Sequence, residues 1–494
     1  MKPKTKKINW LLALTLLFPI TACIDGPNIA EGGIGGTGIG SGSISGFGSI
    51  FVNGIKYDVN SADIFIEGSL ASESELDLGM VVSIQGSFDP DSLEGKATQI
   101  DYQPNIIGNV DSVNIATKFI IVEGQTVTVD ALTVFHGTDL VSLTAGTRVT
   151  VSGLPNRSGN LVARYVAVRS NFQASEIGDP NNGVSSASEP TFDPTDSANF
   201  STSSITIEGK VSALDPFSTS FLLGARQVDY SQASVAPDVL ANGVKVRVSG
   251  DATQTTMAAR KISLASPLLS GQDGTVYALD GYVQNTPNNN ILINGNEVLL
   301  TAATKVTNGR ISTLRQDDHI QVIGRFNSDN SLIAESVTFL NSASVRIEAE
   351  IELIDRNRIT LAGIPTTVSS RTIMLDSSAE RIRRFSTGDL RIGEKLIVHG
   401  TSDNNIEVVL SRLERKDTLQ NTILEGPVNT ITVETSFDIL GTTIDTTNIS
   451  IYQDRDGQDI SSSEFFNTLL EGDVIQVIGS RNGSIFQASE VKAM

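Results

Sequence analysis

The chain has 494 residues, with 36 Lys and Arg against 56 Asp and Glu, so that its net charge is −20. An acidic surface repels phosphate backbones, which argues against a nucleic-acid partner. The single cysteine excludes disulfides within the chain and metal sites built from several cysteines, while the length is enough for several domains.

The first 23 residues have the pattern of a secretory signal. Four lysines precede an apolar run from Trp10 to Ile20, which is too short to span a bilayer. The run is followed by Thr21-Ala22-Cys23, and the stretch Ile20-Thr21-Ala22-Cys23 resembles the lipobox of bacterial lipoproteins. The resemblance implies that residues 1–22 are a signal peptide. It also implies that Cys23 becomes a lipidated N-terminus, with a diacylglyceryl thioether and an N-acyl chain such as palmitate.

Several acyl chains anchor a protein stably where one chain is marginal. Residue 24 is Ile rather than Asp, which by resemblance to enteric sorting rules favours the outer membrane over the inner one. Removal of residues 1–22 takes away four lysines and no acid, leaving a net charge of −24. The alternative is an ordinary signal peptide in which the cysteine is incidental.

Glycine and serine dominate residues 32–48, which read GGIGGTGIGSGSISGFG. The stretch 33–38, GIGGTG, fits the dinucleotide-binding pattern G-x-G-x-x-G. That pattern has meaning only between a strand and a helix, and neither signal flanks it here. The composition instead predicts a flexible tether over residues 23–43.

A short pattern, G-x-x-[VIL]-x-[VI]-x-G, recurs along the chain and indicates internal repeats. Its six copies end at Gly86, Gly153, Gly250, Gly324, Gly400 and Gly479, and the fourth begins with Asp317 in place of glycine. One interval is 97 residues, whereas the others are 67 to 79. The excess coincides with residues 171–203, whose acidic composition without Lys or Arg predicts a disordered linker.

Each copy of the pattern is accompanied by other short strand signals. A hairpin signal around a glycine comes before it, as in Phe119 to Val129, and a strand of the form Ala163-x-x-Val166 follows it. Each unit has five or six short strands and no sustained helical period. A small closed barrel buries one face of such strands and leaves no strand edge unpaired. The predicted fold is therefore all-β, with tandem OB-like barrels over 44–103, 104–170, 204–266, 267–340, 341–417 and 418–494.

The arrangement resembles a family of bacterial predicted lipoproteins that carry tandem copies of domain of unknown function 5666. The residues that carry the resemblance are the Gly-rich leader, Gly46 to Tyr57 (GFGSIFVNGIKY) and Leu78 to Gly86. The fifth unit departs most, since Ala349-Glu350-Ile351 replaces the G-x-V that starts other units. The resemblance implies a surface or periplasmic location, no assigned activity and no catalytic residues.

Acidic residues and histidines are the candidates for chemistry. The stretch DRDGQDI offers Asp454, Asp456 and Asp459, with Glu464 shortly after, but its spacing departs from a calcium-binding EF-hand. We expect a solvated acidic loop there, with calcium as the alternative. His136, His319 and His399 fall in different units, and the last two occupy positions that vary freely between units, which predicts exposed strand faces. We expect no metal and no cofactor.

These features favour a non-catalytic lipoprotein of the bacterial cell envelope that acts as a binding or structural scaffold. Its expected partners are the membrane, through the lipid anchor, and an envelope or extracellular protein or glycan. One alternative is a barrel protein that binds a glycan, a peptide or a cation. An enzyme is the remaining alternative, although no lipase-type G-x-S-x-G elbow and no repeated acid–base pair occurs in the sequence.

Overall fold

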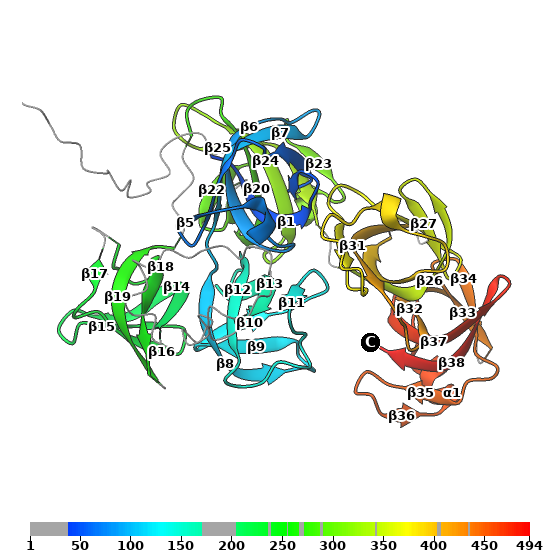
Figure 1. Cartoon of the computed structure of the whole chain (residues 1–494). Coiled ribbons are helices and arrows are strands. Elements are labelled where there is room, and N and C mark those ends of the chain that lie inside the picture. Colours follow the sequence, from blue (N-terminus) through cyan, green and yellow to red (C-terminus); the bar gives the residue numbers. More distant parts are fainter. Residues whose placement is uncertain are drawn as a thin grey trace, which may run out of the picture. The chain divides into compact units, whose positions relative to one another are not determined.

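The computed structural model describes residues 38–169, 204–235, 239–253, 255–265, 271–286, 290–340, 343–402, 407–432 and 435–494. These residues form six small β-barrels, numbered here in chain order (Figure 1). None of the helices within these ranges has the length and the apolar composition needed to cross a bilayer. The predicted all-β fold of tandem OB-like barrels is therefore confirmed.

The first three barrels have the following strands. Barrel 1 contains β1 Gly38–Gly46, β2 Ile50–Val52, β3 Ile55–Asp58, β4 Asp63–Ile66, β5 Ser69–Ala71, β6 Val81–Asp89 and β7 Glu94–Tyr102. Barrel 2 contains β8 Ile106–Asn114, β9 Phe119–Val122, β10 Gln125–Thr128, β11 Val134–His136, β12 Arg148–Pro155 and β13 Leu161–Val168. Barrel 3 contains β14 Ser204–Asp215, β15 Ser220–Leu223, β16 Arg226–Asp229, β17 Ser234–Val235, β18 Lys245–Ala252 and β19 Thr256–Leu264.

The last three barrels follow the same order. Barrel 4 contains β20 Val276–Asn285, β21 Asn290–Ile293, β22 Asn296–Leu299, β23 Lys305–Thr307, β24 His319–Phe326 and β25 Leu332–Phe339. Barrel 5 contains β26 Val345–Asp355, β27 Arg358–Leu361, β28 Ile364–Thr367, β29 Ile373–Asp376, β30 Lys395–Thr401 and β31 Val408–Lys416. Barrel 6 contains β32 Thr422–Thr432, β33 Ser436–Ile439, β34 Thr442–Asp445, β35 Ile451–Gln453, β36 Asp459–Ile460, α1 Ser462–Thr468, β37 Val474–Asn482 and β38 Ile485–Ala493.

Every barrel closes in the same way. In barrel 2 the antiparallel chain β9–β8–β12–β13 is closed by the hairpin strand β10, which pairs with β9 on one side and runs parallel to β13 on the other. The strand β11 also pairs with β13, in parallel. Alternate side chains of the ring point inward, and in barrel 2 they form a core that includes Ile120, Val122, Val149 and Val166. A closed ring removes the free edges that short strands would otherwise expose.

The glycine that ends the repeated sequence pattern lies at a β-bulge rather than in a turn. Register shifts occur between Ser152 and Gly153 and between Ser249 and Gly250. A Cβ placed on Gly250 would lie under 3 Å from the carbonyl oxygen of Ala258 on the neighbouring strand. The repeated glycine therefore permits a close approach of two backbones where the strand bends.

Replacement of this glycine should be costly in any repeat. We expect Gly250→Ala to destabilise barrel 3 by about 2–3 kcal/mol, because the two strands must separate to admit the methyl group. Gly243→Ala is the matched control, since Gly243 has φ +87° but open space around it, so about 1 kcal/mol of strain is expected. Hydrogen exchange of β18 and β19 measures both effects, and equal losses would contradict the bulge explanation.

The predicted tether over 23–43 was wrong for its last six residues. Residues 38–43 belong to β1, which pairs with β6 and β20. Glycine suits this strand because the side chain of Asn53 lies against Gly42, where any Cβ would collide with it. The preceding tether residues, the signal segment 1–22, Cys23 and the predicted linker 171–203 all lie outside the described residues.

The helix α1 was not predicted from the sequence. Ser461 and Glu464 form a capping box, in which the Ser461 side chain accepts from the Glu464 N–H and the Glu464 carboxylate accepts from the Ser461 N–H. The signal was present as Ser461-x-x-Glu464 before two phenylalanines. The short helix packs Phe465 and Phe466 into the core beside Phe437.

The first strand of each barrel is also hydrogen-bonded to the first strand of another barrel. β8 pairs with β14, β26 pairs with β32, and β1 pairs with β20. Within the described residues the barrels therefore form three continuous sheets of 13, 12 and 13 strands. We call each of these contacts a join, so that barrels 2 and 3, 5 and 6, and 1 and 4 are joined.

Candidate functional site

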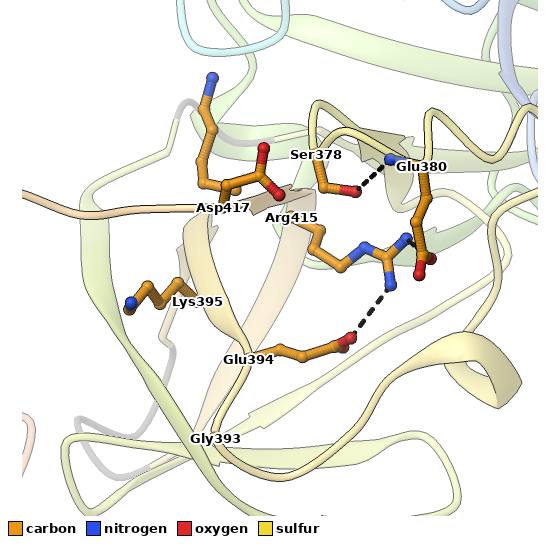
Figure 2. A pocket seen from close by; sticks show the side chains of 8 residues that line it. Ser378, Glu380, Gly393, Glu394, Lys395, Arg415 and Asp417 are labelled. Atoms are coloured by element: carbon orange, nitrogen blue, oxygen red, sulfur yellow. Dashed lines mark hydrogen bonds and ion pairs between the residues drawn. The ribbon is translucent and has the colours of Figure 1, made fainter.

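An open depression of about 270 Å³ in barrel 5 is one candidate for a binding site (Figure 2). Its wall is polar and charged, and it includes Ser378, Glu380, Gly393, Glu394, Lys395, Arg415, Lys416 and Asp417. Small-molecule sites in proteins are mostly apolar, with a few well-placed polar groups. The composition of this wall therefore differs from that of a usual substrate pocket.

The centre of the depression is Arg415, whose side chain is only 4% exposed. Its Nε and Nη2 donate to the two oxygens of Asp376 at 3.0 and 2.6 Å. Nη2 also donates to Glu380 at 2.7 Å and Nη1 to Glu394 at 3.0 Å, as Figure 2 shows. The guanidinium thus holds together three loops or strands that are distant in sequence, and its donors are largely used in doing so.

The pKa values of these groups follow from the same contacts. Burial alone raises the pKa of Asp376, but the hydrogen bond from Arg415, with others from Ser378 and Ile382, holds it well below its usual value. The hydrogen bond to Asp376 raises the pKa of Arg415 despite the opposing effect of burial. Both groups are therefore charged at neutral pH, and neither can exchange a proton in a reaction there.

A second cluster lies around Arg164 of β13, whose side chain is 1% exposed. Its Nη1 donates to both oxygens of Asp130 at 3.1 Å, and its Nη2 donates to the Tyr282 hydroxyl at 2.5 Å. His319 stacks on Tyr282 and makes a 2.6 Å contact with Asp280 through Nε2. Burial raises the pKa of Tyr282 to about 12. The cluster thus connects barrels 2 and 4 through charged and aromatic contacts.

Two histidines differ from the sequence prediction of exposed strand faces. His319 has a side chain only 8% exposed, because Tyr282 and Asp280 cover it. His399 is partly buried, and burial together with the nearby Arg412 and Arg346 lowers its pKa to about 3. His399 is therefore neutral at physiological pH. Variation between repeats indicated exposure wrongly because side chains of neighbouring strands cover these positions, and at His319 Arg164 of barrel 2 also approaches the ring.

The acidic residues of the loop for which calcium was the alternative interpretation have separate roles. Asp454 accepts from the N–H groups of Asp456 and Gln458 at 3.0 and 2.8 Å, Asp459 accepts from Gln453, and Glu464 caps α1. Across the part of the chain that the structure describes, no three His, Cys, Asp or Glu side chains are close enough to hold a metal ion. The capping role of Glu464 explains the position of this carboxylate without a bound cation.

The join between barrels 2 and 3 contains a buried ion pair that the sequence did not indicate. Glu123 and Arg226 are 2% and 6% exposed, and Arg226 Nη2 lies 2.5 Å from Glu123 Oε2. The other carboxylate oxygen of Glu123 accepts from the N–H of Asn109 at 2.7 Å. Glu123 lies in the hairpin turn of barrel 2 and Arg226 directly follows that of barrel 3, in stretches that the sequence patterns had assigned only to turn formation.

The contacts at this join are nearly reciprocal. Arg226 Nε donates to the carbonyl oxygen of Glu123 at 3.3 Å, and Gln125 Nε2 donates to that of Leu223 at 2.7 Å. Gln125 and Arg226 begin equivalent strands of their barrels, namely β10 and β16. The hairpin turn of each barrel therefore contacts that of its partner, in addition to the pairing of β8 with β14.

Comparison with known proteins places most of these barrels in one family. A family model described as "Domain of unknown function (DUF5666)" matches residues 41–101, 107–167, 273–338 and 425–492, which make up just over half of the chain. These matches correspond to barrels 1, 2, 4 and 6. Barrels 3 and 5 are outside the matches, although their strands pair in the same order.

The other comparisons add little. No curated protein matches the chain. Among solved structures it is similar to "drosophila Unr CSD456", with 13% identity over 45% of this chain and 98% of that chain, at a TM-score of 0.16. That score is too low to support an inference about function.

Proposed function

The chain belongs to the DUF5666 family, and on that premise we propose that it is a non-catalytic scaffold of the bacterial cell envelope, anchored by a lipid on Cys23. The observation that carries the proposal is the set of joins. Each described barrel shares a hydrogen-bonded strand pair with one other barrel, so the repeats are connected by more than their linkers. Such connected barrels can space and present surfaces to an envelope protein or glycan.

The charged clusters support a structural role for the same reason. Arg415, Arg164 and Arg226 are almost completely buried, and each pairs with at least one carboxylate from another segment of the chain. General acid–base catalysis is most efficient when the pKa of the catalytic group lies near the working pH. The pKa values of Asp376 and Arg415 have instead moved away from neutrality, in the directions that keep both groups charged.

The lipid anchor rests on the sequence of residues 1–23 and is directly testable. We expect Cys23→Ser to move the protein from the membrane fraction to the soluble fraction of cells, because the acyl chains that supply stable anchoring are lost. Metabolic labelling with an alkyne-bearing palmitate analogue should mark the wild type and leave the variant unlabelled. Thr21→Ser is the matched control, since it keeps the cysteine. A Cys23→Ser variant that stays in the membrane would refute the anchor.

A further inference from the structure

In three barrels the hairpin turn between the second and third strands is a docking point for another barrel of this chain. In barrel 5 the turn glycine, Gly363, lies against Arg481 of barrel 6. In barrel 1, Gly54 lies against Arg371 of barrel 5, and in barrel 2 the Glu123-Gly124 turn lies against Arg226 of barrel 3. An arginine from another barrel therefore covers the turn in three of the repeats.

A polar residue of the first strand holds the arginine at the barrel 5 turn. Glu352 accepts from the N–H of Gly363 at 3.2 Å and from Arg481 Nη1 at 2.7 Å. Glu352 directly follows Ile351, which is paired with Leu361 on the second strand. In barrel 6 the corresponding pair is Val428 with Ile439, so that Asn429 occupies the position of Glu352.

The barrel 6 turn has the same acceptor position but no covering residue. Among the described residues, no atom lies within 4 Å of the space that a Cβ on Gly441 would occupy. The amide oxygen of Asn429 is buried and has no hydrogen-bond partner within the described ranges. Asp438, on the outward-facing side of β33, adds a partly buried carboxylate to the same hairpin.

The covered turns and the charge of barrel 6 indicate what kind of group would dock at this turn. The turns of barrels 2 and 5 are covered by the barrel that follows each of them and shares its join, through Arg226 and Arg481 respectively. The segment 418–494 has 11 Asp and Glu against 3 Lys and Arg, which attracts a cationic group.

We infer that the Asn429 and Gly441 turn of barrel 6 is a docking site for an arginine side chain on a β-hairpin of a protein partner. The guanidinium would stack over Gly441 and donate to the amide oxygen of Asn429, as Arg481 does at Gly363 and Glu352. This inference rests on the proposed scaffold role and names the chemistry of one partner. It does not depend on the lipid anchor, so its failure and that of the Cys23 experiment are distinguishable.

The test uses a hairpin that already carries such an arginine. The probe is a fluorescent, cyclised peptide with the sequence of residues 474–493, whose hairpin structure is verified by circular dichroism before titration. We expect it to bind the full chain, and to bind about fivefold more weakly when its Arg481 is replaced by Lys, because an ammonium lacks the planar fork of donors. Asn429→Arg in the full chain should weaken binding about tenfold or more by filling the site with a like charge, equivalent to about 1.4 kcal/mol or more.

Two further variants make the result specific. Asn429→Glu should tighten binding about fivefold, since it reproduces Glu352 and makes the hydrogen bond charge-assisted. Gln284→Arg, at the equivalent position of barrel 4, should leave binding unchanged, because the Gln284 side chain is already held at both ends: it accepts from the N–H of Gly295 and donates to the carbonyl oxygen of Asn156 in barrel 2. Unchanged thermal unfolding of Asn429→Arg shows that the variant folds. Absence of binding, equal binding of the Arg and Lys peptides, or binding that survives Asn429→Arg would overturn the inference.

Discussion

Arg415→Met is expected to destabilise barrel 5 by about 3–5 kcal/mol, because it leaves a buried carboxylate without its partner. The Asp376 side chain is fully buried, and Arg415 supplies two of its hydrogen bonds. The methionine also loses the contacts to Glu380 and Glu394, which attach two loops to β31. Hydrogen exchange followed by mass spectrometry should show the loss in β29, β30 and β31, while barrel 3 keeps its protection.

The neighbouring residue supplies the control for this experiment. Lys416 pairs with Glu414 at 2.6 Å, but its side chain is 34% exposed. Glu414 keeps its ion pair with Arg412 and its hydrogen bond from Ser377 when Lys416 is lost, so Lys416→Met should have a small effect. If the two variants lost similar stability, the loss in Arg415→Met would be due to the charge of Arg415 and not to its burial.

The effect of Arg415→Met should depend on pH in a defined direction. In the wild type the pKa of Asp376 is lowered, so its ion pair stabilises barrel 5 above the unfolded value of about 3.9 and is lost as the pH falls through the folded value. The variant lacks most of this contribution at every pH. The difference in unfolding free energy between wild type and variant should therefore be largest near pH 7 and shrink in acid. A difference that stays constant down to pH 2 would contradict the assigned cause.

Much of the fold could be predicted because it follows from local patterns. Alternation around a turn glycine is a property of neighbouring residues, and it predicts hairpins such as β9–β10 whatever surrounds them. The bulge at Gly153 also has a local signal, although the sequence alone could not show that the glycine serves a close backbone approach rather than a turn. The repeated pattern thus predicted the barrel fold, but it did not predict the structural role of its closing glycine.

The contacts between barrels could not be predicted, because they bring together residues that are far apart in sequence. Nothing near Glu123 indicates that Arg226 covers it, and nothing near His319 indicates Tyr282 and Arg164. The same limit explains why residues 38–43 were predicted to be part of a tether. Gly40 and Gly42 look like a spacer, yet β6 and β20 turn them into a strand by pairing on both sides.

Arg226→Met should weaken the join between barrels 2 and 3 by about 3–5 kcal/mol, since Glu123 would remain buried with its charge unmatched. The hydrogen bond from the Asn109 N–H persists in the variant and cannot neutralise the carboxylate. Faster hydrogen exchange is expected first at β8 and β14, where the two barrels share strand pairing. Arg260→Met is the control in the same barrel, because Arg260 and its partner Asp251 are 47% and 44% exposed and contribute little.

A double variant separates the charge of this pair from its shape. Glu123→Gln with Arg226→Met removes both charges and keeps most of the volume, and replacing both partners of a buried pair is often close to neutral. We therefore expect the double variant to recover most of the stability that Arg226→Met loses. Recovery would show that Arg226→Met loses stability because Glu123 is left buried without a matching charge. If the double variant were as unstable as Arg226→Met, the arginine would act through its contacts to the backbone oxygens of Glu123 and Thr253 instead.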